Sequence, residues 1–178
     1  YACIDGVAVT CGPGNFTGLR IALTAARTFA RLQAIPAYAI STTHAIAFAH
    51  WQKMQRGTVA QNMLVALDTK RGDYYTQSFS HDCVAQEAPV IRTSADLHAV
   101  LTASGDTVLI GHGLDALIAE APETLTERLA RAQEDMRPDP AVMAMMCYEA
   151  YVPAGVVDDV HPLYLREAET NIPKQAKQ

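Results

Sequence analysis

The sequence lacks any apolar run that is long enough to cross a bilayer. Its longest apolar stretches are interrupted by Arg, His or Gly well before the roughly 20 residues that a membrane helix needs. The basic, apolar and small-residue order of a secretory signal is also missing from the given sequence. We therefore expect a cytoplasmic protein without membrane contact.

Cysteine is scarce and is not arranged in motifs. The cysteines are Cys3, Cys11, Cys83 and Cys147. The absence of a Cys-x-x-Cys pair argues against a zinc knuckle or a redox motif, and buried free thiols are the better interpretation. His44 and His50 lie on different faces of one expected helix, which makes them poor co-ligands. We predict no metal site.

The sequence has fewer basic than acidic residues: 14 Lys and Arg against 19 Asp and Glu, which gives a net charge of −5. This balance gives no electrostatic footprint for nucleic acid, so we expect RNA contact only through a partner. No serine lies in a Gly-x-Ser-x-Gly elbow, which leaves a hydrolase triad without support. A hydrophobic fraction of 49% with 19% charged residues is ordinary for a globular protein of one or two domains.

The most informative stretch that is present joins a strand at Val7–Val9 to a long helix through three glycines. Asn15 or Thr17 can cap this helix, whose first turn leaves N–H groups that attract anions. The glycines also have a purely structural interpretation, in which Gly12 and Gly14 supply positive φ angles and Gly18 allows the helix to pack closely on the sheet. Neither a Walker loop nor the dinucleotide pattern is matched. Backbone could approach a phosphate at Gly12, Gly14, Thr17 and Gly18, and at a second turn with Gly111 and Gly113.

The order of strand, cap and helix repeats after Pro36, and this alternation indicates an α/β class with a mainly parallel sheet. Further strands are expected over Ala37–Ile40, Met63–Asp68, Tyr74–Phe79, part of Cys83–Arg92, and Thr107–Ile110. Further helices are expected from Ser41 or Thr42 towards Met54, from a Ser94 cap through Leu101, from Gly113 to near Ala121, over Glu123–Gln133, and from Asp139 and Pro140 through Tyr151. The polar turn at residues 69–73 includes Gly72, which suits a left-handed conformation.

The long helix, expected over Thr17–Ala34, has an apolar arc of roughly 200°, where a surface helix needs roughly 100°. Its polar stripe consists of Arg20, Thr24, Arg27, Thr28 and Arg31. Such a helix is covered on two sides. One side would be the sheet, and the other a further helix of the chain or another subunit; burial within its own domain is an equal alternative.

The segment GPGNFTGLRIALTAARTFA resembles the GPGSFTGLRIG signature of the bacterial TsaB family, also called YeaZ. The stretch ALDTKRGDYY at 66–75 and PLYLR at 162–166 are similar to later family segments, with Gly-His-Gly at 111–113 between them. The resemblance implies duplicated α/β domains of the actin-like, ribonuclease H-like fold. The family has a strand, a hairpin and a helix before the glycine joint, and the given sequence reaches the joint at residue 12. We therefore expect an incomplete first domain, either because the chain is a shortened version or because it is a segment of a longer protein. We place the domains at 1–57 and 58–167, with a mobile tail at 168–178.

By this resemblance the chain would be a non-catalytic scaffold that binds a TsaD-type threonylcarbamoyltransferase and supports threonylcarbamoyladenosine modification of tRNA. A TsaE-like ATPase would join the complex, tRNA would be contacted only through it, and the chain alone would be a homodimer. No intrinsic cofactor is expected, although ATP or ADP with magnesium could bind at a complex interface. The alternatives are an actin-like phosphotransferase or ATPase, a glycoprotease-like peptidase, and a nucleotide sensor.

The partner-binding surface is predicted on the long helix. Its residues are Phe16, Arg20, Leu23, Thr24, Ala26, Arg27, Ala30 and Arg31. An unpaired charge is costly in an apolar contact, so glutamate at Ala26 is expected to disrupt the complex. Arg20 has a second interpretation, an internal anchor for the glycine joint. We interpret Asp68 and Asp73 as turn residues and His112 as a turn or capping residue, with Lys70 and Arg71 as secondary contacts.

Overall fold

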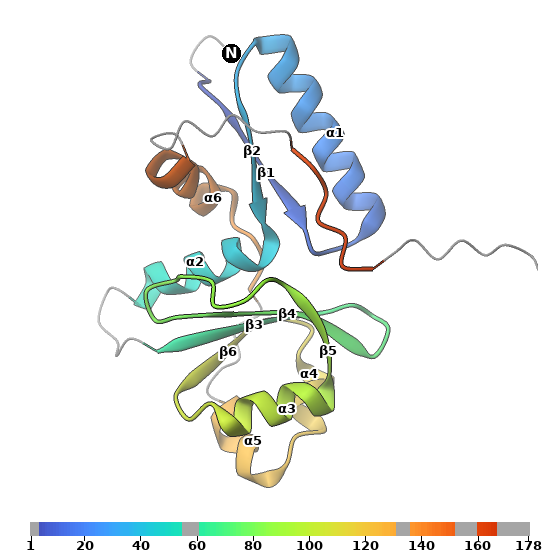
Figure 1. Cartoon of the computed structure of the whole chain (residues 1–178), viewed down its shortest axis with the longest axis vertical. Helices are drawn as coiled ribbons and strands as arrows, with labels where there is room; N and C mark the ends of the chain where they lie inside the picture. Colours follow the sequence, from blue (N-terminus) through green and yellow to red (C-terminus); the bar gives the residue numbers. More distant parts are fainter. Residues whose placement is uncertain (1–3, 55–60, 131–135, 152–159, 167–178) are drawn as a thin grey trace, which may run out of the picture.

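The computed structural model of the chain describes residues 4–54, 61–130, 136–151 and 160–166. It contains a two-stranded sheet and a four-stranded sheet with helix α2 (Thr42–Met54) between them (Figure 1). The α/β class expected from the sequence is confirmed. None of the helices in the described ranges combines the length and apolar character that a membrane span requires.

The first sheet pairs β1 (Val7–Gly12) with β2 (Ala37–Ser41) in parallel. Helix α1 (Phe16–Gln33) makes the crossover and packs on one face of this sheet (Figure 1). Asn15 caps it, because its side chain accepts a hydrogen bond from the Gly18 N–H at 2.9 Å. The helix ends at Ala34, which adopts a left-handed conformation with φ 53°.

The second sheet has the order β5-β4-β3-β6. Its strands are β3 (Asn62–Asp68), β4 (Asp73–Phe79), β5 (Val90–Thr93) and β6 (Thr107–His112). The β3–β6 pair of this sheet is parallel and the other two pairs are antiparallel, so the sheet is mixed. The polar turn that the sequence predicts after residue 68 joins β3 and β4 in a hairpin, which forces antiparallel pairing, whereas the parallel pairing expected from the first strands and helices is found in the β1–β2 sheet.

Both faces of the second sheet are buried. On one face, Met63 and Val65 pack against α2. On the other, Leu64 and Ala66 pack against the helices below the sheet in Figure 1. These helices are α3 (Ser94–Ala103), α4 (Asp115–Ala119) and α5 (Glu123–Ala130). Successive side chains of β3 thus point to two apolar faces in turn, as expected for a sheet that is covered on both sides.

Helix α6 (Pro140–Met146), continued by a π-helical turn at Cys147–Tyr151, covers the face of the first sheet opposite α1 (Figure 1). Asp139 caps it and Pro140 occupies its first position, as predicted. Buried Met143 and Met146 pack against Tyr38 of β2. The first sheet is therefore also a middle layer between helices.

Some predicted features differ from the structure or lie outside its description. Thr93, and not Ser94, caps α3, because the Thr93 side chain and Asp96 exchange hydrogen bonds in a capping box. The boundary at residues 57 and 58, Cys3, the end of the helix predicted to Gln133 and the tail at 168–178 lie outside the described residues.

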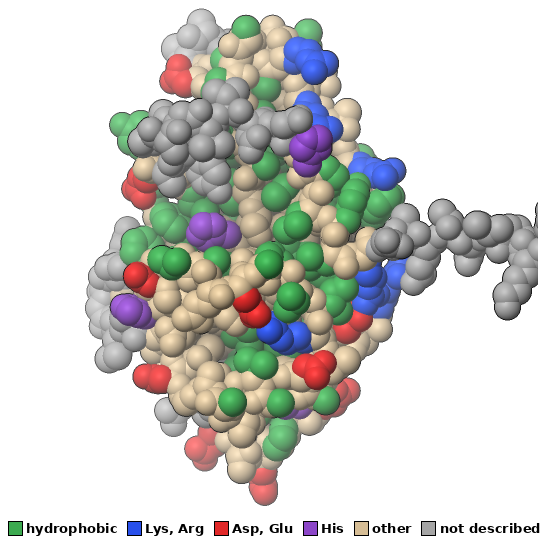
Figure 2. Space-filling model, in the orientation of Figure 1, with side chains coloured by type: hydrophobic (Ala, Val, Ile, Leu, Met, Phe, Trp, Pro, Cys, Tyr) green, Lys and Arg blue, Asp and Glu red, His purple; other side chains and the backbone are tan. Residues whose placement is uncertain are grey.

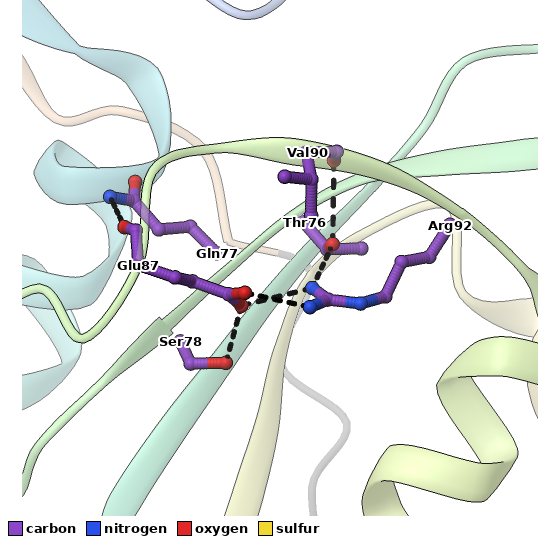
Figure 3. Close-up of polar contacts among 6 residues, drawn as sticks. All are labelled: Thr76, Gln77, Ser78, Glu87, Val90 and Arg92. Carbon is purple, nitrogen blue, oxygen red and sulfur yellow. Dashed lines mark hydrogen bonds and ion pairs between the residues drawn. The ribbon is translucent and has the colours of Figure 1, made fainter.

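A polar cluster holds the loop between β4 and β5 in place (Figure 3). Arg92 donates two hydrogen bonds to the Glu87 carboxylate, at 2.9 and 2.7 Å, and Ser78 donates a third at 2.7 Å. The Gln77 amide donates to the Glu87 carbonyl at 2.9 Å. Hydrogen bonds from Arg92 lower the pKa of Glu87 below its usual 4.5, although burial acts in the opposite direction.

This cluster makes stability depend on pH. A carboxyl with a lowered pKa stabilises the fold above its ordinary pKa, and this contribution is lost as the pH falls through the lower folded value. We expect Glu87→Gln to destabilise the chain by about 2 kcal/mol at pH 7 and by much less at pH 3, measured by urea unfolding. The exposed control Glu127→Gln should change stability by less than about 0.5 kcal/mol. An equal loss for Glu87→Gln at both pH values would contradict this account.

Candidate functional site

Helix α1 buries one narrow face against its own sheet. The buried side chains of this helix are Leu19, Leu23, Ala26 and Ala30. Leu23, Ala26 and Ala30 belong to a core cluster that includes Val9 and Val160. The prediction that Leu23, Ala26 and Ala30 contact a partner is therefore wrong, because these side chains lie beneath the helix in the core of this chain.

A second face of α1 is apolar and largely exposed. Gly18, Ile21, Ala25 and Leu32 are exposed on this face, which we name the exposed stripe, and the half-buried Ala22 and Phe29 lie beside them. The spacings of three, four and seven residues align the stripe along the helix axis. Ile21 is 66% exposed and Leu32 is 77% exposed, which is unusual for such large apolar side chains. The wide apolar arc seen in the sequence thus divides into a buried face and an open one.

The polar stripe of α1 contacts residues 160–166, which we name the C-terminal strap. Arg20 donates a hydrogen bond to the Tyr164 hydroxyl at 2.9 Å, and its guanidinium lies 3.9 Å from the centre of the Phe16 ring. Arg27 donates to the Val160 carbonyl. Arg20 and Arg27 thus have contacts within the chain, and the role of Arg20 as an anchor of the glycine joint stays a prediction. Thr24 and Arg31 are exposed on the same edge of the molecule, where Figure 2 shows basic side chains in blue.

Three of the predicted phosphate-approach glycines pack against the chain itself. Gly12 has φ +117°, and a Cβ there would lie 2.7 Å from the carbonyl oxygen of Leu163 in the strap. A Cβ at Gly113 would lie 2.8 Å from Asp68 Cβ, and one at Gly111 only 1.8 Å from a backbone oxygen of β3. Protein atoms therefore leave no room for a side chain at these three positions, and the predicted approach of a phosphate to their backbone stays a prediction.

The other predicted positions stay predictions. The N–H of Gly18 is taken by the Asn15 cap, and Thr17 is exposed at the start of α1. Gly14 lines a cleft between the two sheets, where a Cβ on its backbone would have no neighbouring atom closer than 3.9 Å.

This cleft has a volume of about 630 Å³ and lies where the parallel strands end. Pro13 follows β1, Thr42 follows β2, Asp68 ends β3 and His112 ends β6, and all four residues line it. The strap closes one side through Leu163. In open α/β sheets ligands bind at the carboxyl ends of the strands, so the topology makes this cleft the natural ligand site.

The charges in the cleft are mostly positive. Its lining includes Lys70, Arg71, Arg137 and Arg166, against one carboxylate, Asp68. Burial favours a higher pKa for Asp68, but the hydrogen bonds and the charge of Lys70, whose Nζ lies 2.7 Å away, outweigh it and lower the pKa.

The carboxylates of the hairpin turn are engaged within the protein. Asp68 accepts a hydrogen bond from the Lys70 N–H at 2.6 Å, and Asp73 accepts from Thr69 and from Arg166 of the strap. These contacts agree with the turn interpretation of both carboxylates. In the described ranges, no group of three His, Cys, Asp or Glu side chains is arranged to hold a metal ion.

The side chains of His44, Cys11, Cys83 and Cys147 are buried or half-buried in the fold. His44 stacks on Phe79 with ring centres 5.6 Å apart, and burial lowers its pKa. Cys11, Cys83 and Cys147 are free thiols, and burial raises the pKa of Cys83 to about 12. Thiolate formation at Cys83 is therefore strongly disfavoured.

Comparison with known proteins adds independent findings. The model of the family described as TsaD, tRNA N6-adenosine threonylcarbamoyltransferase, matches residues 1–87. The chain is 30% identical to the tRNA threonylcarbamoyladenosine biosynthesis protein TsaB of Escherichia coli, over 92% of this chain and 71% of that protein. It is 29% identical to an uncharacterized protein of Mycobacterium tuberculosis, over 94% of this chain and 67% of that one.

The structure of YeaZ from Pseudomonas aeruginosa superposes with a TM-score of 0.70 and 18% identity, over 92% of this chain and 76% of that one. A second structure, described as an uncharacterized protein similar to peptidase YeaZ from the same organism, also gives 0.70, with 19% identity over 93% and 75%. These likenesses confirm that the chain has the α/β fold of the YeaZ structures, the family fold that the sequence resemblance implied.

Proposed function

Because the chain belongs to the TsaB family, we propose that it takes part in tRNA threonylcarbamoyladenosine biosynthesis as a non-catalytic subunit that binds a TsaD-type subunit. The observation that carries this proposal is the exposed stripe of α1. A stripe of this width and length on a helix supports docking of a second helix against it. We further propose that the complex works in the cytoplasm, where it contacts tRNA and recruits a TsaE-like ATPase.

The exposed stripe has the composition that close helix packing requires. Gly18 and Ala25 have little or no side chain, so a partner backbone could approach α1 closely at these positions. Ile21 and Leu32 protrude and could insert between side chains of the partner helix. Burying each of these two side chains is worth about 2 kcal/mol, which makes them the energetic centre of the proposed contact.

Several features of the chain support a subunit without catalysis of its own. Burial raises the pKa of Cys11 and of Cys83, which disfavours both thiols as nucleophiles. The carboxylates of Asp68 and Asp73 are used by the hairpin turn and the strap. A binding role through the exposed stripe needs none of these groups.

The proposal is tested by producing the chain with the TsaD-type subunit of the same organism. We expect a stable heterodimer in size-exclusion chromatography with light scattering, and tRNA modification that requires the chain. The chain alone should run as a homodimer through the same stripe. A folded chain that forms no complex, or a partner that modifies tRNA equally well without it, would contradict the proposal.

A second measurement, of ATP hydrolysis, tests whether nucleotide binds at the interface of the complex. ATP or ADP with magnesium is proposed to bind only after the complex forms, with groups of both subunits completing the site. The isolated chain is therefore expected to hydrolyse no ATP in the presence of magnesium. Turnover by the isolated chain would instead support an actin-like ATPase.

A further inference from the structure

We propose that the polar stripe of α1 contacts the phosphate backbone of tRNA when the chain is bound to its TsaD-type subunit. The side chains of this stripe are all exposed, and they are Arg20, Thr24, Arg27, Thr28 and Arg31. The inference rests on the proposed function and adds to it the surface of this chain that meets the RNA.

The net charge of −5 conceals an uneven distribution of charge along the chain. Residues 6–67 contain five Lys and Arg and no Asp or Glu, whereas residues 68–178 contain nine Lys and Arg and 18 Asp and Glu. In Figure 2 blue side chains lie along the edge that α1 forms at the upper right, and most red side chains lie in the lower half. Such an asymmetry is typical of a protein in which one part contacts nucleic acid.

In the described ranges, no carboxylate forms an ion pair with the arginines of the polar stripe. Arg20 donates a hydrogen bond to the Tyr164 hydroxyl, which is a neutral group. Arg27 donates to the Val160 carbonyl, which is also neutral, and Arg31 is exposed in the last turn of α1. A guanidinium has five N–H donors, so the internal contacts position Arg20 and Arg27 and leave donors for a phosphate.

A hollow of about 680 Å³ lies beside the polar stripe. Its polar lining comes from α1 and from the C-terminal strap, and it consists of Thr24, Arg27, Thr28, Arg31 and His161. No Asp or Glu of the described part of the chain lines it, and Asp158 and Asp159, which precede the strap in the sequence, lie outside that part. Guanidinium groups and hydroxyls are donors that bind phosphate oxygens, so the hollow suits a backbone phosphate.

The length of the polar stripe favours a nucleic-acid backbone over a single small anion. From Arg20 to Arg31 the stripe extends over about 16 Å of the helix axis, at about 1.5 Å per residue. A nucleic-acid duplex presents about one phosphate charge per 1.7 Å of its axis, so several phosphates face such a length. The stripe contains only Arg and Thr, whereas a protein contact usually centres on a large buried side chain. These features favour RNA over an acidic protein.

The test measures binding of fluorescently labelled tRNA to the assembled complex by anisotropy, over a range of salt concentrations. We expect Arg31→Glu to weaken binding at least about tenfold at low salt, and Arg31→Gln to reduce the slope of log affinity against log salt by about one, because one phosphate contact is lost. Arg31→Lys should restore most of the affinity, because it keeps the charge.

Lys53→Glu is the matched control, because it makes the same change of charge at an exposed position. Lys53 lies near the end of α2, which Figure 1 shows on the opposite side of the chain from α1. The affinity for tRNA should stay within about twofold of the wild type. Circular dichroism and thermal unfolding will show that each variant is folded.

Size-exclusion chromatography with light scattering separates the possible failures. If the wild-type chain forms no complex, the proposed function and this inference both fall. If the Arg31→Glu complex forms and binds tRNA as the wild type does, only this inference is overturned. Loss of assembly in Arg31→Glu would assign the polar stripe to the protein contact and overturn it too. Polyglutamate that binds the complex as tightly as tRNA, and through Arg31, would instead indicate an acidic protein partner.

Discussion

Ile21→Glu is expected to abolish the complex with the TsaD-type subunit while the chain stays folded. The Ile21 side chain is 66% exposed, so a charge there is solvated in the free chain. In the proposed interface the same charge would be buried without a partner, which is costly. We expect the dissociation constant to rise at least about 100-fold, measured by isothermal titration or by loss of co-purification.

The control for this experiment is Thr124→Glu, which places the same charge at an exposed position of α5, remote from α1 (Figure 1). It should leave the affinity within about threefold of the wild type. Leu32→Glu should act as Ile21→Glu does. A folded Ile21→Glu variant with wild-type affinity would refute the proposed contact. Ala26→Glu cannot serve as this test, because Ala26 is buried and a charge there would disrupt the fold of the chain itself.

Gly111→Ala is expected to destabilise the chain by more than about 4 kcal/mol, enough to prevent folding of a marginally stable protein. Gly111 has φ +152°, and a Cβ there would lie 1.8 Å from the carbonyl oxygen of Ala66. These residues face each other in the β3–β6 pair, so the added methyl group would separate two central strands. Urea unfolding followed by circular dichroism measures the effect.

Gly105→Ala is the matched control for this substitution. Gly105 lies outside the strands, and nothing lies within 4 Å of a Cβ at that position. Its replacement should change stability by less than about 1 kcal/mol. If Gly111→Ala were as stable as Gly105→Ala, the close approach of β3 and β6 would be wrong.

Local features of the fold could be predicted from the sequence because short-range contacts decide them. Asn15 is one of the two expected caps of α1, and Asp139 with Pro140 marks the start of α6. Gly72 adopts the left-handed conformation expected for the hairpin turn, with φ +82°. The cap of α3 lies one residue before the predicted one, because Thr93 and Ser94 are both good caps and the capping box with Asp96 selects Thr93.

The sequence by itself determined the family, the α/β class and the width of the apolar arc on α1, because motifs and periodicity are properties of neighbouring residues. Only the tertiary structure decided which part of that arc is buried: the orientation of the first sheet covers Leu23, Ala26 and Ala30 and leaves Ile21 and Leu32 exposed. Likewise, Lys70 and Arg137 line one cleft only because chain folding brings distant segments together, and no local pattern encodes that distance.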